Sequence, residues 1–144
     1  MIVYLDASAL VKRYVLEAGT PDVEILLGTT ELAGTALISR AEISAAICKA
    51  VRTRAVDHGA GSAAVKLFRT EWPSLFRLNV DRAVVEAADL LAWAHELRGY
   101  DAVHLACALQ WRDSLSEPVT LATFDQDLWR AAARAGLGVW PTSM

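Results

Sequence analysis

The stretch Ile2-Val3-Tyr4-Leu5-Asp6 opens the chain with a short apolar run that ends on a carboxylate. A short apolar run closed by a turn signal is typical of a strand buried on both faces, as the strands of parallel sheets are. In an open parallel sheet, ligand sites form at the carboxyl ends of the strands. We therefore expect Asp6 to lie at the edge of the sheet where functional groups gather.

Strand-like and helix-like segments alternate along the rest of the chain. Further strands are predicted at residues 35–38, 75–80, 119–122 and 139–140. Helices are predicted over residues 7–17, 81–98, 101–112 and 126–135. A short helix is predicted to begin at Pro21, with Thr20 as its N-cap. Two further helices are predicted on either side of a turn at residues 58–62, one beginning at residue 39 and the other ending at residue 72. This alternation predicts the α/β class, with a parallel central sheet flanked by helices. We expect residues 1–144 to form a single domain.

The composition is that of a folded protein. Hydrophobic residues make up 54% of the 144 residues, and there are only 8 glycines and 4 prolines, which argues against disorder. No signal-like segment opens the chain, and no run approaches the roughly 18 apolar residues that span a bilayer. Cys48 and Cys107 fall in helical patterns and are interpreted as small buried side chains in a reducing compartment. The sequence thus predicts a soluble cytoplasmic protein with no membrane partner.

The formal net charge of -3 argues against a strong non-specific nucleic-acid binder, because such proteins are normally basic. It does not exclude an enzyme that acts on RNA. A bound cation reverses the local charge of an acidic site, at the place where a phosphate must sit.

Four acidic residues follow predicted strands or open predicted helices, namely Asp6, Glu42, Asp101 and Asp125. The topology expected of a parallel sheet brings these positions to one edge. Carboxylates that lie close together repel each other unless they are protonated or bridged by a cation, and hard divalent cations prefer oxygen ligands. The pattern predicts a site for Mg²⁺ or Mn²⁺, and such a site favours phosphodiester chemistry.

Each acid also has an ordinary structural interpretation. Asp6 and Asp101 stand where N-cap residues stand, and aspartate is a common N-cap. Ser39-x-x-Glu42 fits a capping box, in which the glutamate returns to the N-cap backbone amide. One carboxylate cannot fully satisfy both a capping box and a metal, so Glu42 separates the two hypotheses most clearly.

Other polar residues near these acids leave further assignments open. Asp127 is an alternative to Asp125, or merely favours the start of its helix. Ser8 and Thr123 offer hydroxyls that orient a carboxylate or hold a water at the site, unless they are ordinary turn hydroxyls. His104 follows Asp101 by three residues and is interpreted as a packed, hydrogen-bonded side chain.

In combination, four motifs resemble the PIN domain, and more narrowly the VapC-type toxins of bacterial and archaeal toxin–antitoxin pairs. They are Asp6-Ala7-Ser8-Ala9-Leu10, Ser39-x-x-Glu42, Tyr100-Asp101-Ala102-Val103-His104-Leu105-Ala106 and Thr123-Phe124-Asp125-x-x-Leu128. The resemblance extends over essentially the whole chain. It implies a three-layer sandwich in which the four acids form the metal-binding set, with Ser8 and Thr123 at its hydroxyl positions.

The resemblance also implies a function. The family is a Mg²⁺- or Mn²⁺-dependent endoribonuclease, usually a homodimer, which a cognate antitoxin silences. Hydrolysis by an activated water leaves 5′-phosphate and 3′-hydroxyl ends, and no paired catalytic histidines are evident. We expect Arg13, Arg40 and Arg98 near the rim of the site, where arginine contacts phosphates or is merely solvated.

Two rival functions remain. One is a phosphatase or phosphotransferase that uses Asp6 as its nucleophile, although Ser8 stands where the haloacid-dehalogenase pattern requires a second aspartate. The other is a non-enzymatic partner-binding domain, in which the carboxylates only cap helices. Apolar residues near the N-terminus are predicted to form a groove for an amphipathic helix of the antitoxin under either interpretation, namely Val11, Tyr14, Val15, Leu26 and Leu27.

Overall fold

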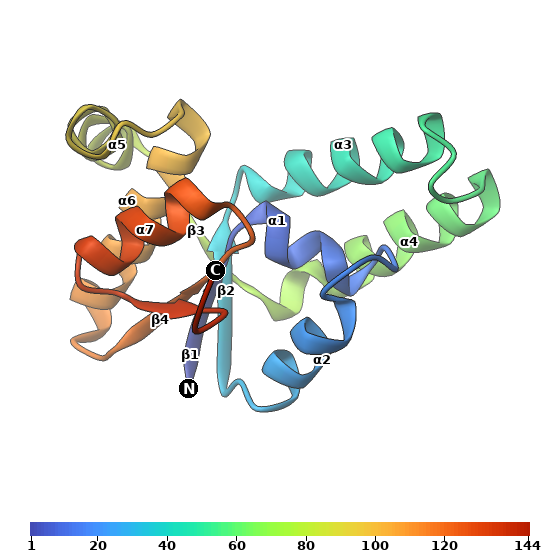
Figure 1. Ribbon diagram of the computed structural model, residues 1–144, viewed down its shortest axis with the longest axis horizontal. Helices are drawn as coiled ribbons and strands as arrows, with labels where there is room; N and C mark the ends of the chain where they lie inside the picture. Colours follow the sequence, from blue (N-terminus) through green and yellow to red (C-terminus); the bar gives the residue numbers. More distant parts are fainter.

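The computed structural model describes residues 1–144 as alternating strands and helices (Figure 1). The strands are β1 (Ile2–Leu5), β2 (Leu32–Ala36), β3 (Phe76–Leu78), β4 (Val119–Ala122) and β5 (Gly138–Trp140). The α-helices are α1 (Ala7–Leu10), α2 (Thr20–Gly28), α3 (Ser39–Arg52), α4 (His58–Glu71), α5 (Arg82–His95), α6 (Gly99–Leu115) and α7 (Gln126–Arg134). Two 3₁₀ helices, η1 (Val11–Arg13) and η2 (Trp72–Ser74), follow α1 and α4.

The five strands form one parallel sheet in the order β3-β2-β1-β4-β5. The chain moves outward from β1 to β3 and then returns to place β4 on the other side of β1, with Leu5 opposite Ala122. The carboxyl ends of β1 and β4 therefore flank the topological switch point, where α/β sheets form their ligand sites. The predicted α/β class with a parallel central sheet is confirmed.

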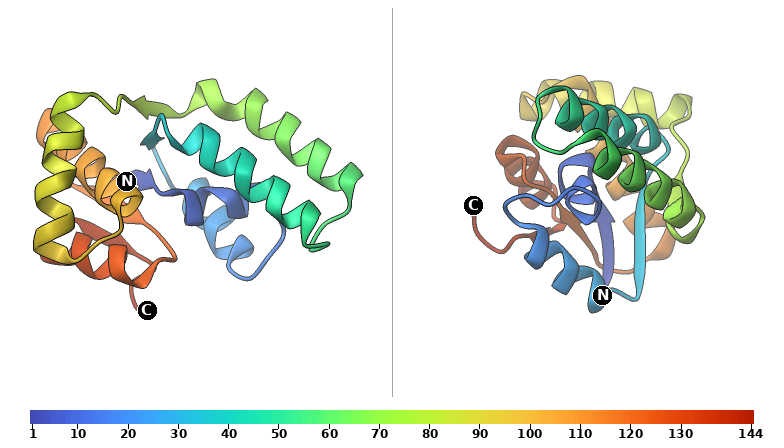
Figure 2. Two further views of the ribbon diagram at one scale, coloured as in Figure 1. Left: turned by 90° about the horizontal axis from the view of Figure 1, so that it is seen from above. Right: turned by 90° about the vertical axis from the view of Figure 1, so that its right-hand side faces the viewer.

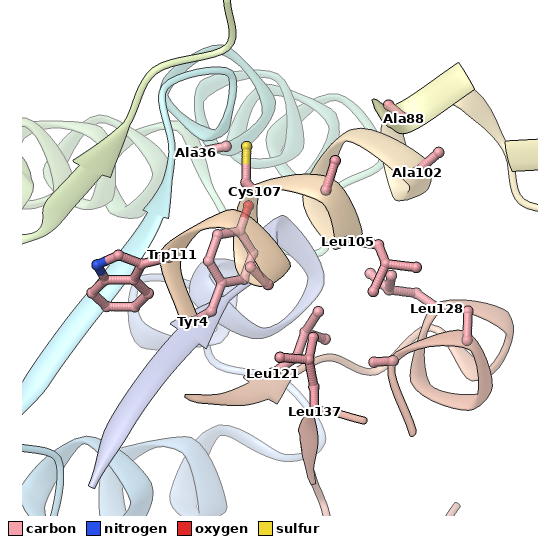
Figure 3. Packing of buried hydrophobic residues seen from close by; sticks show 14 of the residues in the cluster. Tyr4, Ala36, Ala88, Ala102, Leu105, Cys107, Trp111, Leu121, Leu128 and Leu137 are labelled. Carbon is pink, nitrogen blue, oxygen red and sulfur yellow. The ribbon is translucent and has the colours of Figure 1, made fainter. Parts of the chain in front are cut away.

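Helices cover both faces of the sheet and form two separate hydrophobic cores, because successive strand residues point to opposite faces. Tyr4 and Leu121 pack with α5, α6 and α7 on one face (Figure 3). Val3 and Leu5 pack with α1, α2, α3 and α4 on the other face. The predicted three-layer arrangement is confirmed, and β1 lies at its centre. No helix is long and apolar enough to cross a membrane.

Helices α3 and α4 form an antiparallel pair that extends away from the sheet (Figure 2). The sequence predicted a turn at residues 58–62, but these residues form the first turns of α4, which Asp57 caps by accepting a hydrogen bond from the Ala60 amide at 2.7 Å. Gly61 is buried against Val51 of α3, and a side chain there would collide with it. Gly61 therefore serves close helix packing, which overrides the turn that glycines indicate locally.

The segment after β1 is also less regular than the single helix predicted over residues 7–17. It forms α1, then η1, and then a loop in which the Thr20 hydroxyl accepts a hydrogen bond from the Glu17 amide at 3.0 Å and donates to the Val15 carbonyl at 3.2 Å. Thr20 is thus the first residue of α2 rather than its predicted N-cap, which is Gly19. These side-chain hydrogen bonds replace the helical ones.

The bounds of two elements and the exposure of one cysteine also differ from expectation. The second strand is Leu32–Ala36 rather than 35–38, since its pairing with β1 begins at Leu32. Helix α5 ends at His95 because Glu96 adopts a left-handed conformation. Cys48 is exposed on the α3–α4 pair rather than buried, while Cys107 is buried as predicted.

Gly34 of β2 lies directly beneath a large core side chain. A Cβ atom there would approach the Trp111 ring to 2.5 Å, and the ring is already stacked on Phe76 with a 13° interplanar angle. We expect Gly34→Ala to cost about 1–3 kcal/mol of stability and to lower Tm by about 3–10 °C. Thermal unfolding followed by circular dichroism measures this. Gly28→Ala, where a Cβ meets nothing within 4 Å, is the control, and equal Tm values for the two variants would contradict the packing argument.

Candidate active site

Asp6 extends the end of β1 and is held in place by hydrogen bonds. Its backbone amide donates to the Ala122 carbonyl at 3.1 Å, which continues the pairing of β1 with β4. Its carboxylate accepts from the Ala9 amide at 2.9 Å, from the Ser8 hydroxyl at 2.7 Å and from the Thr123 hydroxyl at 2.7 Å. Asp6 therefore caps α1, as the structural interpretation predicted, and also carries a fixed carboxylate at the switch point.

The two hydroxyl residues connect the ends of β1 and β4. The Ser8 and Thr123 oxygens lie 3.3 Å apart, and each also accepts a backbone amide: Phe124 donates to Ser8 at 2.8 Å and Asp125 donates to Thr123 at 3.0 Å. These hydroxyls orient the carboxylate because they donate to Asp6, and by accepting backbone amides they also act as the ordinary turn hydroxyls of the alternative interpretation. The hydrogen bonds agree with the predicted orienting role of both residues.

The charge of Asp6 is costly where it lies, because its side chain is only 4% exposed. Burial raises the pKa of this carboxyl above its ordinary value, while His104, the Ala9 amide and the two hydroxyls act in the opposite direction. Removal from water is the largest of these effects, so the hydrogen bonds compensate the buried charge only in part.

Asp101 and Asp125 approach one another from the first turns of two helices. Helix α6 begins at Gly99, so Asp101 lies inside its first turn and is not its N-cap. Asp125 is the N-cap of α7 and accepts the Leu128 amide at 2.9 Å. The guanidinium of Arg98 donates to the Oδ2 atoms of both acids, from Nε to Asp101 at 3.0 Å and from its terminal nitrogen to Asp125. One cation thus already bridges two of the four predicted acids.

The pKa values of this group follow from its mixed environment. Partial burial raises the pKa of Asp101, the hydrogen bond from Arg98 lowers it, and the nearby Asp125 raises it again. Hydrogen bonding to Asp101 in turn raises the pKa of Arg98. Because the Arg98 side chain is 77% exposed, solvent screens these ion pairs and each is weak.

Glu42 does not form the capping box that its spacing suggested. Helix α3 has no side-chain cap, and the buried Ser39 hydroxyl lies 2.6 Å from that of Thr35, which donates to the Leu5 carbonyl at 2.7 Å. The capping-box interpretation is therefore wrong, since Ser39 already has a buried partner. The Glu42 carboxylate instead lies 2.8 Å from Nε2 of His104.

His104 joins this site to the sheet. It is buried in α6, and its Nδ1 atom lies 2.8 Å from the hydroxyl of Tyr4 in β1. The prediction of a packed, hydrogen-bonded histidine is confirmed, but the sequence did not reveal that its partner is Glu42. The three-residue spacing from Asp101, which places both side chains on one face of a helix, was the available signal.

The remaining polar residues divide clearly between the site and the surface. Asp127 is exposed in the first turn of α7 without a polar side-chain contact, so the geometry favours Asp125 over it. Of the three arginines predicted near the rim, Arg98 bridges two acids of the site, Arg13 pairs with Glu71 at 2.9 Å, and Arg40 lies over the Trp72 ring.

The donors suit a hard cation in chemical type, because all four acids offer carboxylate oxygens. No group of three or more His, Cys, Asp and Glu side chains is arranged so that it could hold a metal ion as it stands. Arg98 and His104 engage three of the four acids instead. Cation binding would therefore require side-chain rotation, above all of the exposed Arg98.

Comparison with known proteins shows which family this chain belongs to and which structures its fold resembles. The family model described as "PIN domain" matches residues 3–134. The chain is 31% identical over 144 residues to "Ribonuclease VapC45" of Mycobacterium tuberculosis, covering 99% of this chain and 97% of that protein. The fold resembles VapC20 of Mycobacterium tuberculosis, described as a sarcin-ricin loop cleaving toxin, with a TM-score of 0.66, 16% identity and coverage of 94% and 95%. It also resembles a toxin–antitoxin complex from Klebsiella pneumoniae, with a TM-score of 0.67, 18% identity and coverage of 95% and 94%.

Because the charge of Asp6 is buried, we predict that removing it raises the thermal stability of the protein by an amount that depends on pH. Because the pKa of Asp6 is raised in the folded protein, its contribution to stability is present at low pH and lost as the pH rises through that pKa. We expect Asp6→Asn to raise Tm at pH 7.5 in EDTA, since asparagine also caps a helix, and the gain to shrink as the pH falls toward about 4.

Thermal melts of the two proteins across this pH range measure the effect. Asp57→Asn, at the exposed N-cap of α4, is the matched control and should change Tm little. A wild-type protein that is more stable than Asp6→Asn at pH 7.5 would refute the argument.

Proposed function

Since the chain belongs to the PIN domain family and is a relative of the VapC ribonucleases, we propose that it is a divalent-metal-dependent endoribonuclease, the toxin of a toxin–antitoxin pair. It hydrolyses RNA phosphodiester bonds with Mg²⁺ or Mn²⁺ as the cofactor. Residues 1–144 act as one nuclease domain. The observation that carries the proposal is the set of contacts among three acids at the switch point. Arg98 bridges Asp101 and Asp125, and Thr123 links Asp125 to Asp6.

Asp6, Glu42, Asp101 and Asp125 are the proposed metal ligands. These carboxylates would hold the cation, which would supply activation of a water and neutralisation of charge on the phosphoryl oxygens. Ser8 and Thr123 keep Asp6 oriented through the hydrogen bonds that they donate. One of the carboxylates accepts the proton of the attacking water.

Arg98 has a second role in this proposal. Its guanidinium is exposed, and its ion pairs with Asp101 and Asp125 are screened by solvent. If a cation took the place of Arg98 on these two acids, the guanidinium would be free to turn toward the substrate. The freed guanidinium can then donate to phosphate oxygens in the paired geometry that arginine favours.

The two rival functions fit the structure less well. A phosphatase of the haloacid-dehalogenase pattern requires a second aspartate where Ser8 stands, and the Ser8 hydroxyl here donates to Asp6 instead of supplying a second carboxylate. Helix capping explains Asp6 and Asp125 but not Asp101 or Glu42, which cap no helix. The partner-binding function is retained as an addition to catalysis and not as a replacement for it.

The proposed antitoxin site lies at the N-terminal helices, as predicted, but its residues differ from those of the predicted groove. Val15 and Leu26 of the predicted groove are buried in the core and cannot form a docking surface. Leu16 and Ile25 are instead exposed on the same segment, at 84% and 68%. We propose that an apolar helix of the cognate antitoxin covers these two side chains.

The proposed activity is tested with the partner-free protein, total RNA and either Mg²⁺ or Mn²⁺. Asp125→Asn should lower the cleavage rate by about 100-fold or more, because asparagine retains the cap on α7 but removes the charge. EDTA should abolish cleavage, and mapped products should carry 5′-phosphate ends. Asp127→Asn, which removes an exposed neighbouring charge, should cleave like the wild type. Cleavage that persists in EDTA would overturn the metal dependence.

A homodimer is also proposed, as the family resemblance implies. Leu90 and Trp93 on α5 are 71% and 90% exposed. Apolar side chains this exposed favour association. We expect Trp93→Glu to shift sedimentation toward the monomer, while Ile25→Glu on α2 leaves it unchanged. A wild-type monomer at micromolar concentration would contradict the proposal.

A further inference from the structure

Three side chains form a continuous hydrogen-bonded chain from the core to the acidic site. The Tyr4 hydroxyl lies 2.8 Å from Nδ1 of His104, and Nε2 of His104 lies 2.8 Å from Oε1 of Glu42. The residues come from β1, α6 and α3. They therefore join the central strand to a helix on each side of the sheet.

Glu42 has no other hydrogen-bond partner that fixes its carboxylate. Its side chain is 26% exposed, and the capping contact that would have anchored it does not form. A glutamate side chain held at only one point loses considerable rotamer entropy when it is ordered. The position of this carboxylate thus depends on His104.

His104 is suited to hold another group still because it is itself fixed. The residue is 2% exposed, and its ring meets that of Tyr4 edge-on, with centroids 5.9 Å apart and an interplanar angle of 70°. Both ring nitrogens are engaged. The imidazole can neither rotate nor flip without breaking a buried hydrogen bond.

The chemistry of the two outer groups assigns the protons of this chain. An ionised carboxylate only accepts, so Nε2 carries the proton that is donated to Glu42. With a single proton on the imidazole, Nδ1 is then an acceptor for the Tyr4 hydroxyl. The Tyr4 side chain is buried, and its hydroxyl lies 2.8 Å from this nitrogen.

The surroundings of Tyr4 are consistent with this assignment. Its hydroxyl points toward Cys107 in the core between β1 and α6 (Figure 3). The sulfur of a thiol is a weaker acceptor than an imidazole nitrogen, so Cys107 does not compete strongly with His104. The hydroxyl therefore has one strong acceptor.

From these contacts we propose that His104, oriented by Tyr4, is a positioning residue that presents Glu42 to a divalent cation. One oxygen of Glu42 accepts from His104, and the other is left for the cation. The inference rests on the proposed function, because it assumes that Glu42 is a ligand. It adds to that function two residues, His104 and Tyr4, which act through Glu42 and do not contact the substrate.

The first test measures Mn²⁺ affinity by calorimetry with the full-length, EDTA-treated protein. We expect His104→Leu to weaken binding by about 10–100-fold, the usual effect of losing a group that orients a ligand. Tyr4→Phe should weaken it by about 5-fold, the equivalent of one neutral hydrogen bond. His104→Gln retains an amide donor and should recover most of the affinity. Wild-type affinity in a folded His104→Leu protein would overturn the proposal.

A double-mutant cycle separates positioning from general damage to the fold. In a Glu42→Gln background, His104→Leu should cause little further loss of Mn²⁺ affinity, because its effect passes through Glu42. A further loss as large as that in the wild-type background would show that His104 acts on the fold as a whole, and would refute the positioning role.

The tautomer of His104 gives an independent result without metal or activity. A long-range ¹⁵N–¹H correlation spectrum should show the proton on Nε2 in the wild type, and a changed Nδ1 resonance in Tyr4→Phe. A proton on Nδ1 would overturn the assignment. If the wild-type protein neither binds Mn²⁺ nor cleaves RNA while the tautomer is as assigned, the proposed function fails and the hydrogen-bonded chain stands.

Discussion

The structure depends on a charge that is buried at the centre of the sheet. Asp6 follows the strand that lies between β2 and β4, and its carboxylate is almost inaccessible to water. A buried carboxylate is tolerated only with several donors around it. Those donors come from both flanking segments, Ser8 and Ala9 after β1 and Thr123 after β4. The pairing of β1 with β4 brings the two strand ends together, and the hydrogen bonds to this one carboxylate fix the polar groups that follow them.

Helix capping and cation binding do not exclude each other at this edge of the sheet. Asp6 and Asp125 each cap a helix through Oδ1, while Oδ2 takes a different contact, Thr123 for Asp6 and Arg98 for Asp125. A carboxylate has two oxygens with about four lone-pair directions, so one side chain can begin a helix and still face a ligand. Glu42 does not combine the two roles, because it caps no helix.

The sequence was most informative where local rules act alone. The apolar run before Asp6 and the alternation of segments predicted the sheet, its parallel class and the edge at which the acids gather. The errors came from side-chain contacts in the folded protein that outweigh the local signal. Ser39-x-x-Glu42 has the spacing of a capping box, but the Ser39 hydroxyl pairs with Thr35 and Glu42 pairs with His104, 62 residues away. Gly61 indicated a turn, yet it permits the approach of α3 to α4. Neither partner can be read from local spacing.

The four acids divide into two pairs that differ in how tightly they are held. Asp6 and Glu42 are positioned by donors that are themselves buried, so moving either one breaks hydrogen bonds that water cannot easily replace. Asp101 and Asp125 are joined by an exposed arginine, whose ion pairs water and salt screen. Under the proposed function, a divalent cation would meet one pair of acids that is already in place and one pair whose present partner is easily displaced. The buried pair would then fix the position of the cation, and the exposed pair would exchange Arg98 for it.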